Sequence, residues 1–229
     1  DEKDPNHIKV GVIVGAEQQV AEAAQKIAKE KYGLDVELVT FNDYVLPNEA
    51  LSKGDIDVNA FQHKPYLDQQ IKDRGYKLVS VGNSFVYPIA GYSKKIKSLD
   101  ELQPGSQVAI PNDPTNLGRS LLLLQQVGLI KLKEGVGLLP TSLDIIENPK
   151  NLKLVELEAP QLPRSLDDAQ IALAVINTTY ASQIGLTPAK DGIFVEDKDS
   201  PYVNLIVTRE DNKDAENVKK FVQAYRSEE

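Results

Sequence analysis

The fold of this chain is most constrained by a regular alternation of short apolar strands and amphipathic helices. Residues 7–14 are rich in valine and isoleucine and alternate in polarity, which is typical of a strand. Residues 16–31 carry apolar side chains at helical spacing, and residues 34–41 alternate again. This is a strand, a helix and a strand within about 35 residues, the size of a βαβ unit. The pattern predicts an α/β fold whose sheets are covered by helices.

The same pattern continues to the end of the chain. We expect further strands over residues 56–61, 76–81, 84–92, 107–110, 152–157, 171–176, 192–195 and 202–208. We expect further helices over residues 47–53, 64–74, 98–102, 116–127, 139–147, 177–184 and 214–225.

The alternation restarts near residue 90, which indicates two lobes. Lobe 1 would comprise residues 1–88 and 199–229, and lobe 2 residues 89–198. Two extended crossover segments, residues 84–92 and 200–207, would join them. Such an arrangement is typical of hinge-closing binding proteins, with a ligand cleft between the lobes.

One stretch, residues 108–124, predicts an anion site in lobe 2. It consists of a short buried strand, a polar turn that contains two prolines, and a leucine-rich helix. Asp113, Thr115 and Asn116 are residue types that cap a helix start, whose first turn offers unpaired N–H groups. Arg119 follows one turn later. Free amides and an arginine can bind a carboxylate or a phosphate, although an ordinary capped helix with a surface arginine would give the same pattern.

Residues at the ends of the expected strands and on the crossovers form a consistent set, because ligands bind there in open α/β sheets. Aromatic side chains make up one part of the set, and amides with an arginine make up the other. Together they suit a small zwitterion with an apolar tail. The candidate ligand-binding residues are Tyr44, Phe61, His63, Phe85, Tyr87, Asn116, Arg119, Asn177 and Asn204.

Several of these residues have a structural alternative. His63 can simply cap the helix that starts near Lys64, Phe85 can belong to the core, and Asn177 can serve only as a helix N-cap. Asn204 lies inside an apolar strand, where a buried amide costs free energy unless it has partners. We therefore favour a functional role for Asn204.

Composition excludes several classes of function. The net charge of −8 and the pI of about 5.0 argue against nucleic-acid binding. With no cysteine and two histidines, we expect neither a thiol nucleophile nor a metal site, and no cofactor. No Gly-x-Ser-x-Gly elbow, Walker loop, Gly-x-Gly-x-x-Gly fingerprint or His-Glu-x-x-His motif occurs, and no apolar run reaches the length of a membrane span. The alternative to a binding protein is a small α/β enzyme acting on an amino-acid-like substrate, with His63 as its base.

Four motifs, in this order along the chain, resemble the NlpA/MetQ family of lipoproteins. They are Ile-Lys-Val-Gly-Val (residues 8–12), Phe-Gln-His-Lys-Pro-Tyr-Leu (61–67), Pro-Asn-Asp-Pro-Thr-Asn-Leu-Gly-Arg (111–119) and Ser-Pro-Tyr-Val-Asn (200–204). The resemblance covers essentially the whole chain. It implies a two-lobed periplasmic-binding fold that captures methionine and delivers it to the permease and ATPase of a bacterial ABC importer.

The resemblance also implies roles for the candidate residues. Arg119 would bind the ligand carboxylate, Asn116, Asn177 and Asn204 its polar end, and the five aromatic candidates its thioether, since sulfur packs well against ring edges. The family is lipid-anchored at the periplasmic side of the inner membrane through an N-terminal cysteine. This sequence has no cysteine, so we expect the anchor in the full-length protein only, and we expect a monomer.

Overall fold

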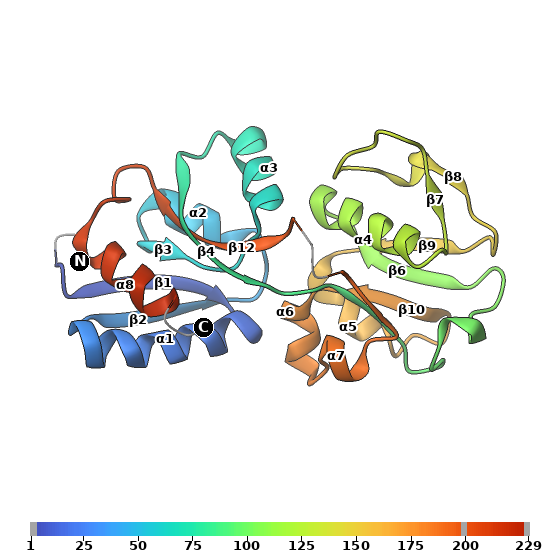
Figure 1. Cartoon of the computed structure of the whole chain (residues 1–229), viewed down its shortest axis with the longest axis horizontal. Helices are drawn as coiled ribbons and strands as arrows, with labels where there is room; N and C mark the ends of the chain where they lie inside the picture. The colour runs from blue at the N-terminus through green and yellow to red at the C-terminus, as the bar shows by residue number, and fades with distance from the viewer. Residues whose placement is uncertain (1–3, 198–200, 227–229) are drawn as a thin grey trace. The chain divides into compact units, whose positions relative to one another are not determined.

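In a computed structural model, which describes residues 4–197 and 201–226, the chain forms two compact units. Unit 1 comprises Asp1–Tyr87 and Pro201–Glu229, and unit 2 comprises Pro88–Ser200 (Figure 1). Each unit has its own sheet, its own helices and its own core, so the predicted α/β class is confirmed. The expected lobe boundary at residues 198–199 lies outside the described residues.

Unit 1 is built on a five-stranded sheet in the order β2-β1-β3-β12-β4. Strand β1 is parallel to β2 and β3, whereas β12 is antiparallel to both β3 and β4. The elements of this unit are β1 (His7–Ile13), α1 (Ala16–Tyr32), β2 (Asp35–Phe41), α2 (Leu46–Lys53), β3 (Val58–Asn59), α3 (Lys64–Arg74), β4 (Leu78–Val86), β12 (Val203–Arg209) and α8 (Glu216–Arg226).

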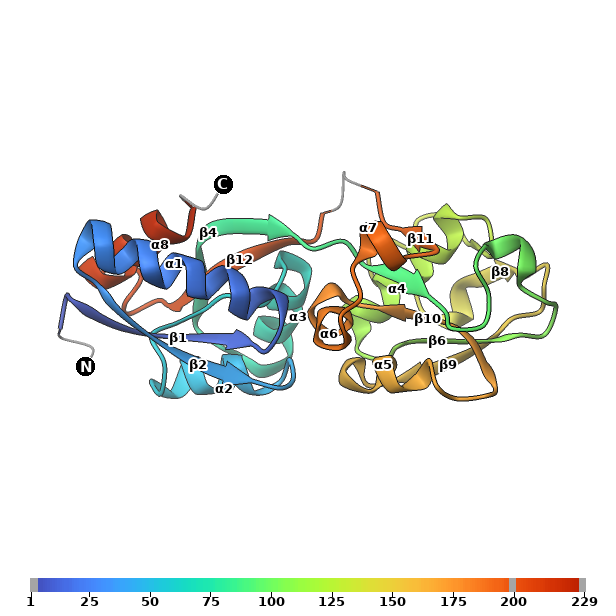
Figure 2. The ribbon, with the colours of Figure 1, turned by 90° about the horizontal axis from the view of Figure 1, so that it is seen from below.

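Two helices from opposite ends of the chain cover one face of this sheet. Helices α1 and α8 lie side by side (Figure 2), and their apolar faces pack on Ile8, Val10 and Val12 of β1. A second apolar cluster on α2 and α3 includes Leu51 and Leu67. With the helices so placed, residues that follow β2 and β3 and those that open β12 meet at one edge of the sheet.

Unit 2 has a second five-stranded sheet, in the order β11-β5-β10-β6-β9. Strand β6 is parallel to β9 and β10, and β5 is antiparallel to β10 and β11. The elements are β5 (Ala90–Tyr92), β6 (Gln107–Pro111), α4 (Pro114–Gln126), β7 (Lys131–Leu132), β8 (Ile145–Glu147), β9 (Lys153–Leu157), α5 (Leu162–Ser165), β10 (Ile171–Ile176), α6 (Thr178–Ala181), α7 (Pro188–Asp191) and β11 (Phe194–Val195), with short 3₁₀ helices at Leu99–Glu101, Ser142–Asp144, Ala159–Gln161 and Ser182–Ile184.

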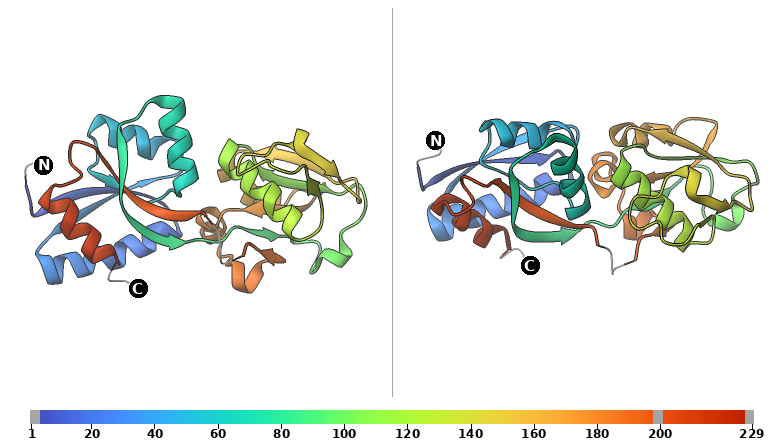
Figure 3. Two further views of the ribbon diagram at one scale, coloured as in Figure 1. Left: turned by 45° about the horizontal axis from the view of Figure 1, so that its top comes forward. Right: turned by 90° about the horizontal axis from the view of Figure 1, so that it is seen from above.

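Helix α4 is the main helix of unit 2. It begins at Pro114, two residues before the predicted start, and Asp113, one of the three predicted cap residues, is its N-cap. Leu117, Leu121 and Leu124 pack into the core of this unit together with residues of β6 and β10. Figure 3 shows α4, in yellow-green, lying against the strands of unit 2. The leucines therefore fix α4 on the sheet and thereby place its polar first turn at the carboxyl end of β6.

The predicted helix over residues 139–147 is wrong. A 3₁₀ turn capped by Thr141 and the short strand β8, which pairs with β7, occupy this stretch. Leu143 is 93% exposed, so its apolar side chain does not face a core. The apolar spacing misled because Pro140 and the left-handed Gly135 and Gly137 set up a turn-rich loop there.

Two other expectations change in detail. The long extended run over residues 84–92 is divided between β4 and β5, with Pro88 in the gap between them. The expected helix over residues 98–102 is a single 3₁₀ turn with a capping box formed by Ser98 and Glu101.

Candidate functional site

At the carboxyl edge of the sheet of unit 1, five ring side chains gather into what we call the aromatic cluster. Ring centroids lie 5.9 Å apart for Tyr44 and Phe61, 5.8 Å for Tyr44 and Tyr66, and 4.9 Å for His63 and Tyr202. The Tyr66 hydroxyl donates to the Tyr44 carbonyl over 2.8 Å. Three of the predicted residues, Tyr44, Phe61 and His63, are thus brought together.

His63 has two roles at once. It is the N-cap of α3, and its Nδ1 accepts a hydrogen bond of 3.1 Å from the backbone N–H of Tyr66. The capping alternative is therefore confirmed, and the ring still packs edge-on against Tyr202. Asn204 pairs with His63 through an isolated antiparallel bridge and is buried, with 7% of its surface exposed. Asn204 thus lies beside the aromatic cluster.

Phe85 and Tyr87 lie at the end of β4, where Val86 pairs with Val203 at the start of β12, so they are at the same edge of the sheet as Tyr202 and Asn204. Phe85 packs on the core beneath α1 and α8, and its ring centroid lies 6.3 Å from those of Tyr87 and Tyr225. The core alternative for Phe85 is confirmed. Burial, reinforced by Tyr225 and Glu17, raises the pKa of the Tyr87 hydroxyl far above its ordinary value. A ligand role for these two residues stays a prediction.

At the carboxyl edge of the sheet of unit 2 lies a second group, which we call the polar cluster: Asp113, Asn116, Arg119, Asn177 and Glu196. Asn116 and Arg119 share one face of α4, one turn apart. Asn116 Nδ2 donates to Asp113 Oδ2 over 3.0 Å and its Oδ1 accepts from Asn177 Nδ2 over 3.2 Å. The three predicted residues of this unit are therefore also brought together.

Asp113 aligns the start of α4. Its carboxylate accepts from the backbone N–H and the side-chain amide of Asn116 and from the Thr115 hydroxyl. Burial raises the pKa of the Asp113 carboxyl, and the hydrogen bonds from Asn116 and Thr115 oppose that change. The cap thus fixes the amide of Asn116 as well as the helix.

Asn177 stands at the N-cap position of α6 but does not cap it. Its side chain makes no capping hydrogen bond and turns to Asn116 instead. Its Oδ1 is fully buried, and no donor in the described residues reaches it. A buried acceptor of this kind costs roughly 1–3 kcal/mol when it is unpaired. Its orientation is therefore not explained by the stability of the fold.

Arg119 forms a buried ion pair that the sequence did not reveal. Its Nε donates to Glu196 Oε2 over 2.8 Å and its Nη2 to Glu196 Oε1 over 2.6 Å. The side chains of Arg119 and Glu196 are only 4% and 10% exposed. The arginine is therefore a buried group of the core edge, not the surface residue of the alternative interpretation.

Two residues of the two clusters, Tyr66 and Glu196, were missed by sequence reasoning as ligand candidates, whereas Tyr202 lies on the predicted second crossover and Asp113 is a predicted cap residue of the anion site. Tyr66 follows His63 by three residues, the spacing of a first helical turn, which could have signalled it. Glu196 directly follows the apolar pair of β11, so its place at a strand end was readable, but its partner 77 residues away was not.

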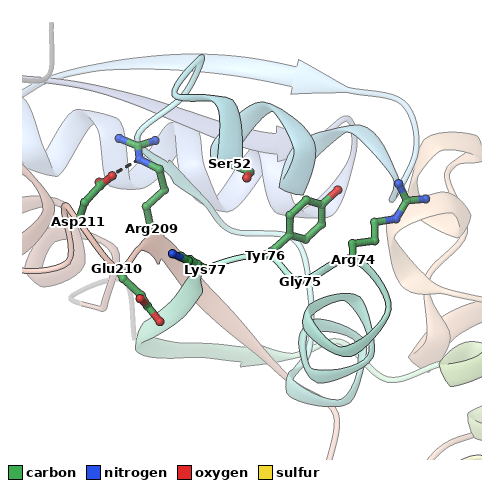
Figure 4. A pocket seen from close by; sticks show the side chains of 8 residues that line it. All are labelled: Ser52, Arg74, Gly75, Tyr76, Lys77, Arg209, Glu210 and Asp211. Atoms are coloured by element: carbon green, nitrogen blue, oxygen red, sulfur yellow. Dashed lines mark hydrogen bonds and ion pairs between the residues drawn. The ribbon is translucent and has the colours of Figure 1, made fainter.

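A surface pocket of about 780 Å³ lies in unit 1 at the opposite end of β12 from Asn204, and none of the nine predicted residues lines it. Figure 4 shows Arg209 joined to Asp211 there, with Arg74 at the far side. Arg209 also donates to the carbonyls of Leu51 and Ile56. Its guanidinium thus ties together backbone segments of unit 1.

Two further properties bear on function. Within residues 4–197 and 201–226, no group of His, Cys, Asp or Glu side chains is arranged to hold a metal ion. In the same part of the chain no helix combines the length and the apolar character of a membrane span.

Comparison with known proteins identifies the family. The family model of the NlpA lipoproteins matches residues 8–229. The chain belongs to the NlpA lipoprotein family. The resemblance seen in the four sequence motifs is thus confirmed. Within the NlpA family the chain is 94% identical to the D-methionine-binding lipoprotein MetQ of Salmonella typhimurium, over the whole chain and 84% of that protein.

Solved structures of similar proteins agree with the fold. A crystal structure of the methionine-binding protein MetQ has a TM-score of 0.96 at 92% identity, over 97% of this chain and 91% of that one. A nutrient-binding protein of Burkholderia cenocepacia bound to methionine reaches 0.92 at 55% identity, over 96% and 91%. A periplasmic substrate-binding protein of an ABC transporter from Coxiella burnetii reaches 0.91 at 49% identity, over 96% and 92%. The NlpA chain described here therefore has the periplasmic-binding fold.

Proposed function

We propose that this chain is a non-enzymatic receptor that binds methionine and delivers it to an ABC importer. The family, the names of its relatives and the methionine-bound structure at 55% identity support the ligand class. The observation that carries the proposal is the buried, unpaired Oδ1 of Asn177, held in the same hydrogen-bonded group as Asn116 on the helix that bears Arg119.

The polar cluster of unit 2 suits the amino-acid end of the ligand. An arginine presents fixed N–H groups to a carboxylate, and amide oxygens accept from an ammonium. We assign the ligand carboxylate to Arg119 and the ammonium to the Oδ1 atoms of Asn177 and Asn116. Binding would give Asn177 the donor that its surroundings do not supply.

The aromatic cluster of unit 1 suits the thioether. Its rings present faces and edges, with centroids 5.9 Å apart for Tyr44 and Phe61 and 5.8 Å apart for Tyr44 and Tyr66, and sulfur packs favourably against ring edges. We assign Tyr44, Phe61 and His63 to this contact, extend the group to Tyr66 and Tyr202, and assign Asn204 beside them to the polar end of the ligand. We also assign Phe85 and Tyr87, at the end of β4 beside the start of β12, to the thioether contact.

The setting follows from the family. We infer a monomer at the periplasmic side of the inner membrane, lipid-anchored in the full-length protein, whose partners are a membrane-embedded permease and its ATPase. The relatives are named as a lipoprotein and as a periplasmic substrate-binding protein of an ABC transporter.

An enzymatic function finds no support in the arrangement of groups. His63 is the one candidate base from the sequence, and its Nδ1 accepts a backbone hydrogen bond as a helix cap. A general base needs an accepting nitrogen directed at a substrate proton.

A thermal-shift screen over the twenty L-amino acids and D-methionine tests the proposed function. At a thousandfold excess over Kd, a ligand that binds only the folded state raises the free energy of unfolding by about 4 kcal/mol. We expect a raised melting temperature with methionine alone among the L-amino acids. A shift with another amino acid, or no shift with any, contradicts the proposed ligand.

A further inference from the structure

We propose that Glu196 determines specificity at the carboxylate end of the site, by making it accept a zwitterion in preference to a monoanion. This rests on the proposed function, in which Arg119 binds the ligand carboxylate. Within that function, Glu196 provides selection for the ligand's positive charge, which neither the motif around Arg119 nor the aromatic cluster provides.

Glu196 is held firmly in place by unit 2. It follows β11, and its backbone N–H donates to the Ile89 carbonyl over 3.0 Å. Its Oε1 accepts from the Ile89 backbone N–H over 3.5 Å and from Arg119 Nη2, and its Oε2 accepts from Arg119 Nε. The carboxylate is thus hydrogen-bonded to the backbone just before β5 and also to one edge of the Arg119 guanidinium. Its negative charge has a fixed place beside the atoms that would meet the ligand.

The consequence for ligand choice follows from charge. The Arg119–Glu196 pair is neutral as a whole, so a carboxylate ligand feels both the attraction of the arginine and the repulsion of the glutamate. A zwitterion brings an ammonium, which Glu196 attracts, whereas the same molecule without its amino group gains no such compensation. For charges about 7 Å apart in a protein interior this difference is worth roughly 10- to 100-fold in relative affinity.

The other acidic group of the polar cluster acts in the same direction. The Asp113 carboxylate is bound to Asn116 and Thr115 at the start of α4, one turn before Arg119. Any negative charge there also disfavours a monoanion. Asn177 Oδ1, as an acceptor, favours a ligand that can donate.

The test compares two ligands by isothermal titration calorimetry: L-methionine, and 4-(methylthio)butanoate, which lacks only the amino group. Wild type should prefer methionine strongly. In Glu196→Gln, or in Glu196→Ala if the first variant does not fold, the ratio of the two Kd values should fall by roughly 10- to 100-fold. A merely structural role would weaken both ligands together and leave the ratio unchanged.

Glu147→Gln is the matched control, because Glu147 forms an exposed pair with Lys131 in the same unit. Its ratio should equal that of wild type. An unchanged ratio in the Glu196 variants, with wild type binding methionine, overturns the role of Glu196 alone. Absence of methionine binding by wild type overturns the proposed function instead.

A second measurement tests the pair in the unsubstituted protein. In ¹⁵N-labelled wild type without added ligand, we expect the Arg119 guanidinium, assigned with Arg119→Lys, to show slow rotation and slow exchange of its Nε proton. Free rotation and rapid exchange would show that Glu196 does not hold the arginine, and would overturn the proposal even if every variant failed to fold.

Discussion

At the scale of one residue, Asn177 is the position where we expect a substitution to lower ligand affinity without a matching loss of stability. It occupies a helix N-cap position, where an asparagine side chain ordinarily bonds to the helix backbone, yet it points to Asn116 and leaves its Oδ1 buried without a donor. Arg119 is also not explained by stability alone, because burying an ion pair costs desolvation energy that can exceed the attraction between the two charges. At both residues the burial of a polar or charged side chain costs free energy, and contacts with a ligand can offset this cost.

Asn177→Ala should therefore lose affinity but little stability. The variant gives up one hydrogen bond of 3.2 Å and removes an unpaired acceptor, so the free energy of unfolding without ligand should change by no more than about 1 kcal/mol. Loss of a hydrogen bond to an ammonium should weaken methionine binding roughly 10- to 100-fold. Chemical denaturation and calorimetry measure the two quantities.

Asn148→Ala is the control for this prediction. Asn148 uses both ends of its amide on the backbone of Leu152, at 3.0 Å each, far from the polar cluster in sequence. It should lose stability and keep its affinity for methionine. A loss of stability in Asn177→Ala as large as that of the control would make Asn177 structural.

At the scale of the element, helix α4 holds Asn116 and Arg119 of the polar cluster in place. Its leucine face fixes it to the sheet, its cap fixes its first turn, and Gly118 lets the loop at Leu138 lie against it. A Cβ at Gly118 would lie 2.3 Å from the Leu138 carbonyl oxygen and 3.1 Å from Pro140 Cδ. The glycine thus serves close packing, not a turn.

Gly118→Ala should destabilise the protein although alanine is the better helix former. Alanine gains about 1 kcal/mol of helix propensity over glycine. Overpacking against a backbone carbonyl costs typically 1–3 kcal/mol, and part of it should appear as a shift of α4 that weakens methionine binding. Denaturation curves check this against Gln126→Ala, an exposed position of the same helix that should be neutral. If Gly118→Ala is more stable than wild type, the loop at Leu138 can move away to make room for the added methyl group, and the prediction is wrong.

The helices and strands also show which features of the structure can be predicted from the sequence. Strands, helices and the capped start of α4 were predictable, because alternation and cap residues are local signals. The failure at residues 139–147 is local too, since a capped 3₁₀ turn resembles a helix start. The Arg119–Glu196 pair was not predictable, because it depends on which strand ends share an edge of the sheet.

At the scale of the whole molecule, the chain builds two five-stranded sheets and places one of the two side-chain clusters at the carboxyl edge of each. The loops that follow parallel strands lie at one edge of a sheet, and an antiparallel strand begins at that same edge. The start of β12 therefore places Tyr202 and Asn204 there in unit 1, and the start of β5 places Ile89 beside Glu196 in unit 2. The central claim is that the polar cluster of unit 2 binds the amino-acid end of methionine through Arg119.

The most direct test is calorimetric titration of methionine into the double variant Arg119→Gln/Glu196→Gln. Removing both charges together avoids leaving one buried charge unpaired, so the protein should stay folded. We predict a loss of affinity of roughly 30-fold or more, the cost of a buried hydrogen-bonded charge pair to the ligand, while Lys131→Gln/Glu147→Gln binds like wild type. A double variant that is folded and binds methionine as tightly as wild type would contradict the account.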